Sequence, residues 1–339
     1  MTRTKWILTL ILSAIWCSRA LAVGVPDFRV ERIVNSADLI IVADVIEIRD
    51  LGRTAPIHFG NYVEEARAYS ADLLVLRTLK GPVLHELTVS YSLPIEFQGY
   101  SPLVLGSRLV FLRRDKDLYH LADPYYSNFP ATRESPEEHT GLEVSGLVWS
   151  NMLAVLSSPT APISEKYQIM RVDYDLPRNE MTITALREAV DATGDPELRE
   201  RLQGELVRVG DLNELPNVVN LVSKGLTTRN GKQWFLFVIA WDVKDPRAIP
   251  ELQPLLSSVD DSVREAAVEA LWHIGTQAAV PALVQKLEDP DEMVRFYAVR
   301  GLADIANEYG WGGPSVGEFQ GHEQRYLTHW QEWAKNQAQ

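Results

Sequence analysis

Two stretches near the C-terminus, AIPELQPLLSSVDDSVREAAVEALWHI (248–274) and AVPALVQKLEDPDEMVRFYAVRGLADI (279–305), superimpose with a constant offset of 31 residues. The matches include the early proline, the leucines around it, an aspartate and a Val-Arg pair. Self-similarity at a short fixed period is typical of stacked repeats, in which each unit buries its apolar face only against its neighbours. The sequence therefore predicts an α-solenoid in this half of the chain.

Each repeat is predicted to contain two helices. The first helices, at 248–256 and 279–287, carry a proline in their first turn, where a missing N–H costs nothing. The second helices, at 262–274 and 292–306, follow aspartates that can cap them. Apolar residues recur along them at helical spacing and predict one inward stripe each: Val263, Ala267, Leu271 and Ile274, then Val294, Ala298, Leu302 and Ile305.

This pattern resembles the HEAT-repeat family, specifically the short bacterial variety related to phycobiliprotein-lyase-type repeats. An offset of 65 extends the match upstream to Leu198 and Arg199, so a degenerate unit must lie between, with its second helix at 232–243. We expect about four helix pairs over 179–309, followed at 310–339 by a loop and a helix that caps the exposed apolar end.

Regularly spaced arginines offer two interpretations. The resemblance implies that Arg199, Arg264 and Arg295 each pair with an aspartate before the helix in their own or the adjoining repeat. Asp195, Asp260 and Asp291 stand at suitable positions. Alternatively, the arginines could line a groove for an acidic partner, but we favour the scaffold role.

The second helices should also carry the partner-binding residues, since in this family they line the concave surface. The residues expected to project from the apolar stripes are Glu265, Glu269, His273, Phe296, Arg300 and Asp304. Phe296 next to basic residues is typical of a binding hot spot, although it could instead tuck under a neighbouring helix.

The N-terminal part has a different period. After an amphipathic helix at 28–35, five apolar runs bounded by Gly, Pro or Asp predict strands at 39–48, 68–79, 86–92, 107–113 and 118–122. Five strands in about 100 residues predict a small β-barrel at 27–130. The overall fold class is therefore α+β in separate domains.

The phrases SADLIIVA (36–43), LKG (79–81) and GSRLVFL (106–112) resemble a domain of exported bacterial proteins. That domain is similar to the oligonucleotide/oligosaccharide-binding (OB) barrel of netrin modules and tissue inhibitors of metalloproteinases. The zinc-chelating N-terminal Cys-x-Cys of those inhibitors is absent between Val23 and Arg32. Between barrel and solenoid, 131–178 is expected to be a linker with one connecting helix at 144–156.

The first 22 residues are predicted to be a cleaved export signal. Basic residues precede an apolar run, and Ala20-Leu21-Ala22 supplies a cleavage site. The run is shorter than a bilayer-spanning helix, so we expect a periplasmic or secreted protein with no membrane span after cleavage. Cleavage removes the only cysteine, Cys17, and takes the formal charge from −13 to −16 because three basic residues and no acid are lost. This acidity argues against nucleic acid as the partner.

No catalytic motif occurs in the chain. The zinc motif His-Glu-x-x-His, the Gly-x-Ser-x-Gly elbow and the common phosphate and dinucleotide loops are all missing. His322 and His329 lie seven residues apart and could bridge a metal only with further ligands. We expect no enzyme activity, no cofactor and no metal.

The sequence thus predicts a non-enzymatic exported scaffold that binds another periplasmic or extracellular protein through the concave face of its solenoid. The alternative is a hydrolase inhibitor or glycan-binding auxiliary acting through the barrel loops at 53–65 and 94–102. Chromophore attachment, as in lyase-type relatives, is disfavoured because export would separate the protein from such substrates.

Overall fold

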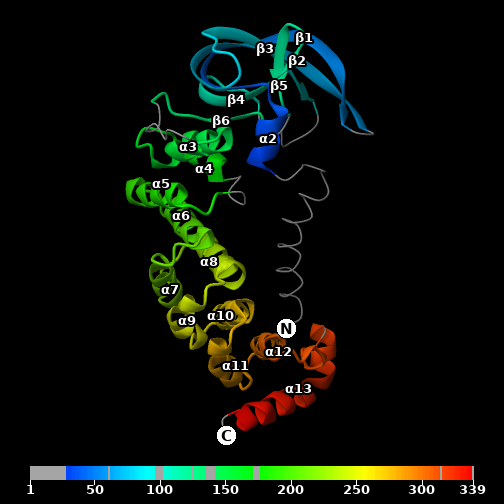
Figure 1. Cartoon of the computed structure of the whole chain (residues 1–339), viewed down its shortest axis with the longest axis vertical. Coiled ribbons are helices and arrows are strands. Elements are labelled where there is room, and N and C mark those ends of the chain that lie inside the picture. Colours follow the sequence, from blue (N-terminus) through cyan, green and yellow to red (C-terminus); the bar gives the residue numbers. More distant parts are fainter. Residues whose placement is uncertain are drawn as a thin grey trace. The chain divides into compact units, whose positions relative to one another are not determined.

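The computed structural model describes residues 28–59, 62–95, 102–123, 126–134, 142–170, 176–313 and 315–337. These residues form two compact units, the first ending at Leu176 and the second beginning at Pro177 (Figure 1). A six-stranded sheet in the first unit and repeated helices in the second confirm the predicted fold class. The predicted export signal at 1–22 lies outside the described residues.

The strands of the first unit pair in a ring. After α2 (Val30–Ser36), the chain forms β1 (Leu39–Phe59), β2 (Tyr62–Lys80), β3 (Glu86–Pro94), β4 (Gly106–Asp115) and β5 (Leu118–Leu121). The pairing order β1-β2-β3-β5-β4 returns from β4 to β1. The ring closes unevenly, because β3 and β5 run parallel and share two residue pairs, Val89–Tyr119 and Ser90–His120.

The core of this ring follows from side-chain alternation. Leu39, Ile41 and Ala43 of β1 face inward with Val110 and Leu112 of β4. The opposite face of the same strands is buried as well, since α2 and α3 (Val144–Ser157) pack against β4. Residues 39–43 of β1 and 109–112 of β4 are therefore continuous apolar runs rather than an alternating pattern.

One of the predicted barrel loops is mostly strand. β1 and β2 pair from Ile40–Lys80 out to Phe59–Tyr62 and so form a long hairpin. This hairpin includes most of the predicted loop at 53–65, of which residues 60–61 lie outside the described residues. The register shifts at four places along this hairpin, and irregularities of this kind bend and twist strands. Of the second predicted loop, residues 96–101 also lie outside the described part of the chain.

The segment expected to be a linker contributes to the first unit. It holds α3 and a second helix, α4 (Ile163–Ile169), and a short strand β6 (Asn128–Pro130) precedes it. The buried guanidinium of Arg108 on β4 joins these parts by donating to Asn128 Oδ1 at 2.8 Å and to Gln168 Oε1 at 3.3 Å. Burial lowers the pKa of Arg108 to about 10, and Glu165 partly opposes this.

The second unit consists of helix pairs. From Glu180 onward the described residues form four pairs, as predicted, and a final helix. The pairs are α5 (Glu180–Ala192) with α6 (Pro196–Val209), α7 (Leu215–Ser223) with α8 (Arg229–Asp242), α9 (Ile249–Leu256) with α10 (Asp261–Ile274), and α11 (Val280–Lys286) with α12 (Glu292–Ala306). The degenerate unit predicted from the 65-residue offset is the α7–α8 pair.

The helices lie in two layers. α6, α8, α10 and α12 pack side by side in chain order, and we call them the inner layer; α7, α9 and α11 lie on the other side (Figure 1). A continuous apolar core from Val207 to Trp330 lies between the layers. Seven of the eight stripe residues belong to it, and the eighth, Ile305, is partly buried and packs against it. The helical phase predicted from the repeat is therefore confirmed.

The last helix closes the core. α13 (Val316–Gln337) contains a kink at His322, so helix begins within the stretch expected to be a loop. Trp330 is fully buried and Tyr326 nearly so, which fits the predicted cap. Within the described residues, no helix combines the length and the apolar character needed to cross a bilayer.

Candidate functional site

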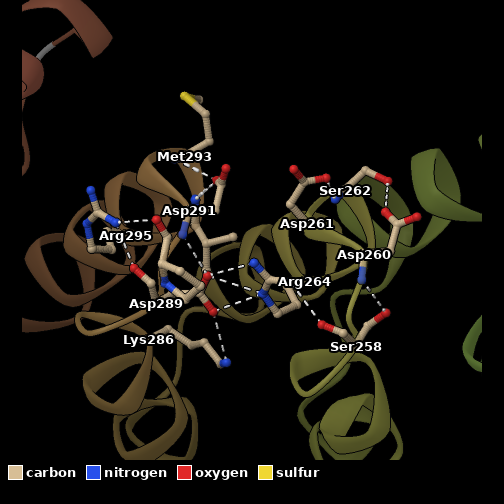
Figure 2. Close-up of polar contacts among 12 residues, drawn as sticks. Ser258, Asp260, Asp261, Ser262, Arg264, Lys286, Asp289, Asp291, Met293 and Arg295 are labelled. Carbon is tan, nitrogen blue, oxygen red and sulfur yellow. Dashed lines mark hydrogen bonds and ion pairs between the residues drawn. The ribbon is translucent and has the colours of Figure 1, made fainter. Parts of the chain in front are cut away.

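An ion-pair network holds neighbouring inner helices in place (Figure 2). Arg264 of α10 donates from Nε and Nη2 to the carboxylate of Asp289 at 3.0–3.1 Å and from Nη1 to the Ser258 carbonyl at 2.9 Å. Lys286 and the backbone N–H of Asp291 donate to the same carboxylate. Burial acts to raise the pKa of Asp289, but the hydrogen bonds from Arg264, the Asp291 backbone and Lys286 outweigh it and lower that pKa.

The arginines therefore serve the scaffold, but with partners other than those expected. Arg264 pairs with Asp289 rather than Asp260, because Asp260 binds Lys232 of α8 and Ser262. Arg295 donates to Glu323 of α13 and to the Asp289 carbonyl.

Arg199 donates to the Thr193 carbonyl at 2.7 Å, which also places it within the scaffold. Asp195 and Asp291 cap the N-termini of α6 and α12 through backbone N–H groups. Two of the three aspartates predicted as arginine partners thus cap helices instead.

Aromatic rings run across the inner layer from α8 to α12. The ring centroids of Trp241 and His273 lie 4.8 Å apart, those of His273 and Trp272 4.9 Å, and those of Trp272 and Tyr297 5.9 Å. We call these four residues the aromatic row. Trp241 is 50% exposed, so a large apolar ring is open to solvent at one end of the row.

A second aromatic group lies on α8. Trp234 and Phe237 stack with centroids 5.8 Å apart, and the guanidinium of Arg201 lies 3.6 Å from the Trp234 ring centroid. The position of the Trp234 indole against α6 requires Gly204, because a Cβ at that residue would collide with the ring. Phe237 is 41% exposed and extends the apolar surface beside Trp241.

The prediction that Phe296 belongs to this surface is wrong. Its side chain is only 5% exposed and packs against Phe319 of α13, with ring centroids 5.4 Å apart. The cap therefore removes it from the surface, which is the alternative that the sequence left open.

Glu265 and Glu269 lie one turn apart on α10, and we call them the acid pair. Glu269 is only 7% exposed, so the expectation that it projects freely is also wrong. α8 and α12 both pack against α10, and this packing accounts for the burial of Glu269. Burial, followed by the negative charges of Asp291 and Asp261, raises the pKa of Glu265 to about 7. Burial and the negative charge of Glu265 raise the pKa of Glu269 to about 7 as well.

The remaining predicted residues surround Trp272. The Arg300 guanidinium lies 4.8 Å from the Trp272 ring centroid, and Asp304 accepts a hydrogen bond from the indole N–H. His273 donates from Nδ1 to the Ala240 carbonyl at 2.7 Å. These three residues therefore orient the aromatic row.

The structure brings five of the six predicted residues to one face and adds several that the sequence pattern did not reveal: Trp241, Trp272, Tyr297, Phe237 and Arg201. The sequence of α8 did contain a signal for this surface. Trp234, Phe237 and Trp241 recur at i, i+3 and i+7, out of phase with the buried Phe235, Val238 and Ile239. Two apolar stripes on one helix indicate a second contact surface.

Replacing Glu269 with Gln should stabilise the protein at alkaline pH. The folded pKa of about 7 exceeds the ordinary value of 4.5, so between these values the folded state binds more protons and stability falls as pH rises. We expect Glu269→Gln to raise the free energy of unfolding by about 1–3 kcal/mol at pH 8, after allowing for partial solvent screening. At pH 4.5 the gain should vanish.

Urea unfolding at the two pH values checks this, with the exposed neighbour Glu288→Gln as the control. A variant that is less stable than the parent at pH 8 would contradict a buried, uncompensated carboxylate at this position.

No metal centre lies among the described residues, since they contain no group of three or more His, Cys, Asp or Glu side chains that could hold an ion. His322 is exposed at the kink of α13, whereas His329 stacks on Trp311 at 3.9 Å and bonds Glu308 through Nε2 at 2.8 Å.

A family match supports the repeat architecture of the second unit. Residues 249–309, which span α9 to α12, match the family described as HEAT repeats. Among solved structures, the chain is similar to an engineered protein from the Northeast Structural Genomics Consortium, at 18% identity and a TM-score of 0.34 over 55% of this chain and 96% of that one. A search of curated proteins found no match. The family match alone places HEAT repeats in the second unit. Such repeats generally form helical scaffolds for protein interaction.

Proposed function

We propose that this protein is a non-enzymatic scaffold that is exported and binds another protein through the inner layer of its HEAT repeats. The aromatic row, with its exposed Trp241 and the exposed Phe237 beside it, is the observation that carries the proposal. Aromatic residues with a neighbouring arginine are enriched where binding energy concentrates. The rings are also held by Asp304, Ala240 and Arg300, so little side-chain freedom is lost on binding.

Site-specific crosslinking tests the surface and does not require the partner to be identified beforehand. We place the photo-crosslinker p-benzoyl-phenylalanine at position 237 or 241 in cells that produce the protein. We expect adducts of discrete mass from both positions, because both side chains are exposed on the proposed surface. The measurement is immunoblotting of the protein after irradiation.

Positions 226 and 259 serve as controls, because Leu226 and Val259 are large exposed apolar residues that lie outside the inner helices. Adducts that form equally well from the control positions would show that contact is unspecific. A further probe placed in the β1–β2 hairpin would assign binding to the first unit if it formed adducts while positions 237 and 241 did not.

Export forms part of this proposal and has its own test. If residues 1–22 are a cleaved signal, the protein recovered from outside the cytoplasm begins at Val23. Intact mass spectrometry of that protein measures the start directly. Retention of Met1, or a lipid on Cys17, would contradict cleavage after Ala22.

A further inference from the structure

Glu269, the buried member of the acid pair, differs from the other buried acids of the second unit. The described residues give each of those acids a partner: Glu200 accepts from Thr228, Glu205 from Arg208, Asp211 from Arg187, and Asp289 from Arg264 and Lys286. Glu269 is 7% exposed and Glu265 is half-buried, yet among the described residues no hydrogen bond or ion pair joins either glutamate to another group. Burying a carboxylate without a partner costs free energy, so this pair calls for a ligand.

The neighbouring charges do not compensate the pair. Its own helix adds Asp261, and the N-cap of α12 adds Asp291, so these neighbouring carboxylates increase the negative charge. The cations on the neighbouring helices already have partners. Lys232 of α8 binds Asp260 at 2.6 Å, and Lys286 of α11 binds Asp289. Arg300 of α12 lies over the Trp272 ring and donates to the Gly313 carbonyl. His273 bonds Ala240, and Tyr297 lies beside both glutamates. The pair is therefore an unfilled site for positive charge.

We infer that the partner proposed above presents an extended segment whose Lys or Arg side chain binds between Glu265 and Glu269, with its aliphatic stem along the aromatic row. This inference rests on the proposed function and adds the chemistry of the partner. Carboxylates supply charge-assisted hydrogen bonds, and aromatic faces attract cations and cover methylene groups.

The same face already binds cations in this way. Arg201 lies over Trp234, and Arg300 lies over Trp272. The acidic chain, with a formal charge of −13, adds a long-range attraction for a basic segment.

A basic side chain fits the pair better than a divalent metal does. Metal ions of the calcium and magnesium type need several oxygen ligands, and here the described residues offer two carboxylates without a third that could join them. An ammonium or guanidinium group is satisfied by two carboxylates, and the bordering rings would give a hydrated metal ion no ligands.

A synthetic peptide provides the probe. Fluorescein-labelled Gly-Ser-Lys-Gly-Lys-Ser-Gly is titrated with the full protein at low ionic strength and pH 8, and fluorescence polarisation measures binding. The matched peptide carries Gln in place of both Lys. We expect the Lys peptide to bind about tenfold more tightly than the Gln peptide, and the double variant Glu265→Gln with Glu269→Gln to lose that difference.

Charge and folding are controlled separately. Glu288→Gln removes a single exposed acid and should leave binding within about twofold. The double variant should be at least as stable as the parent at pH 8, so its loss of binding would not reflect unfolding. Because both glutamates have pKa values near 7, binding should weaken about tenfold from pH 8 to pH 6 in the parent only.

Each other outcome overturns the inference. Equal binding of the two peptides would exclude a cation site. If Glu288→Gln weakened binding as much as the double variant does, the binding would reflect only general charge attraction. Saturable binding of MgCl₂ or CaCl₂ alone that needs both glutamates would make it a metal site. Self-association that the double variant abolishes would make the occupant a second copy. If crosslinking from positions 237 and 241 succeeds while the peptides fail, the scaffold function stands and only the basic partner is rejected.

Discussion

Asp289→Ala should lower the free energy of unfolding of the second unit by about 3–5 kcal/mol, because it leaves the buried Arg264 guanidinium without its carboxylate. Lys286 and the Asp291 N–H lose the same acceptor. One residue thus joins the loop before α12 to α10 in the preceding repeat (Figure 2). Urea unfolding followed by far-UV circular dichroism measures the loss.

The effect of Asp289 should depend on pH in a defined direction. Its folded pKa lies below the ordinary value, so its contribution is present above that value and is lost as pH falls through the folded pKa. The gap between parent and variant should therefore be full at pH 7 and shrink in acid. Glu288→Ala removes an exposed acid one residue away and should change stability by less than about 0.5 kcal/mol. Equal midpoints for the two variants would show that the Arg264 pair contributes nothing.

Leu271→Ala should destabilise the protein by about 2–5 kcal/mol through the cavity it creates. Leu271 is fully buried in the core between the helical layers. Neighbouring repeats stabilise one another, so the loss should appear in the unfolding of the stacked helices and leave the strands of the first unit unaffected. Tryptophan fluorescence during urea unfolding reports on it, because most of the tryptophans lie in the second unit.

Two variants bracket this prediction. Val259→Ala shortens a fully exposed side chain and should change stability by less than about 0.5 kcal/mol. Leu271→Met keeps the volume and should cost less than about 1.5 kcal/mol. If Leu271→Ala and Val259→Ala unfold at the same urea concentration, the assigned inward face of α10 is incorrect.

The predicted repeats agree with the structure because their signal is local. The 31-residue period places proline, leucine and Val-Arg at matching points of successive units, and each unit folds into the same helix pair. The inward stripe follows from the 3.6-residue period, so Leu271 and Leu302 could be assigned to the core without coordinates.

The candidate site could be predicted only in part, because exposure in a solenoid depends on neighbouring helices. Glu269 points away from its own apolar stripe, yet α8 and α12 flank it and bury it. Phe296 appears exposed on α12 considered alone, but Phe319 of the kinked last helix covers it. Trp272 and His273 join the aromatic row through contacts with residues more than 20 positions away.

By itself the sequence determined the order of the two units, the helix pairs, their inward phase and the acidity of the chain, since these depend on period and composition. Only the tertiary structure decided which acid Arg264 binds and which side chains form the surface. Both depend on long-range packing: Asp260 is taken by Lys232 of the preceding pair, while Asp289 comes within reach once α11 and α12 stack on α10. The same stacking buries Glu269 and half-buries Glu265 without a counter-ion, and thereby creates the site for which we propose a basic partner.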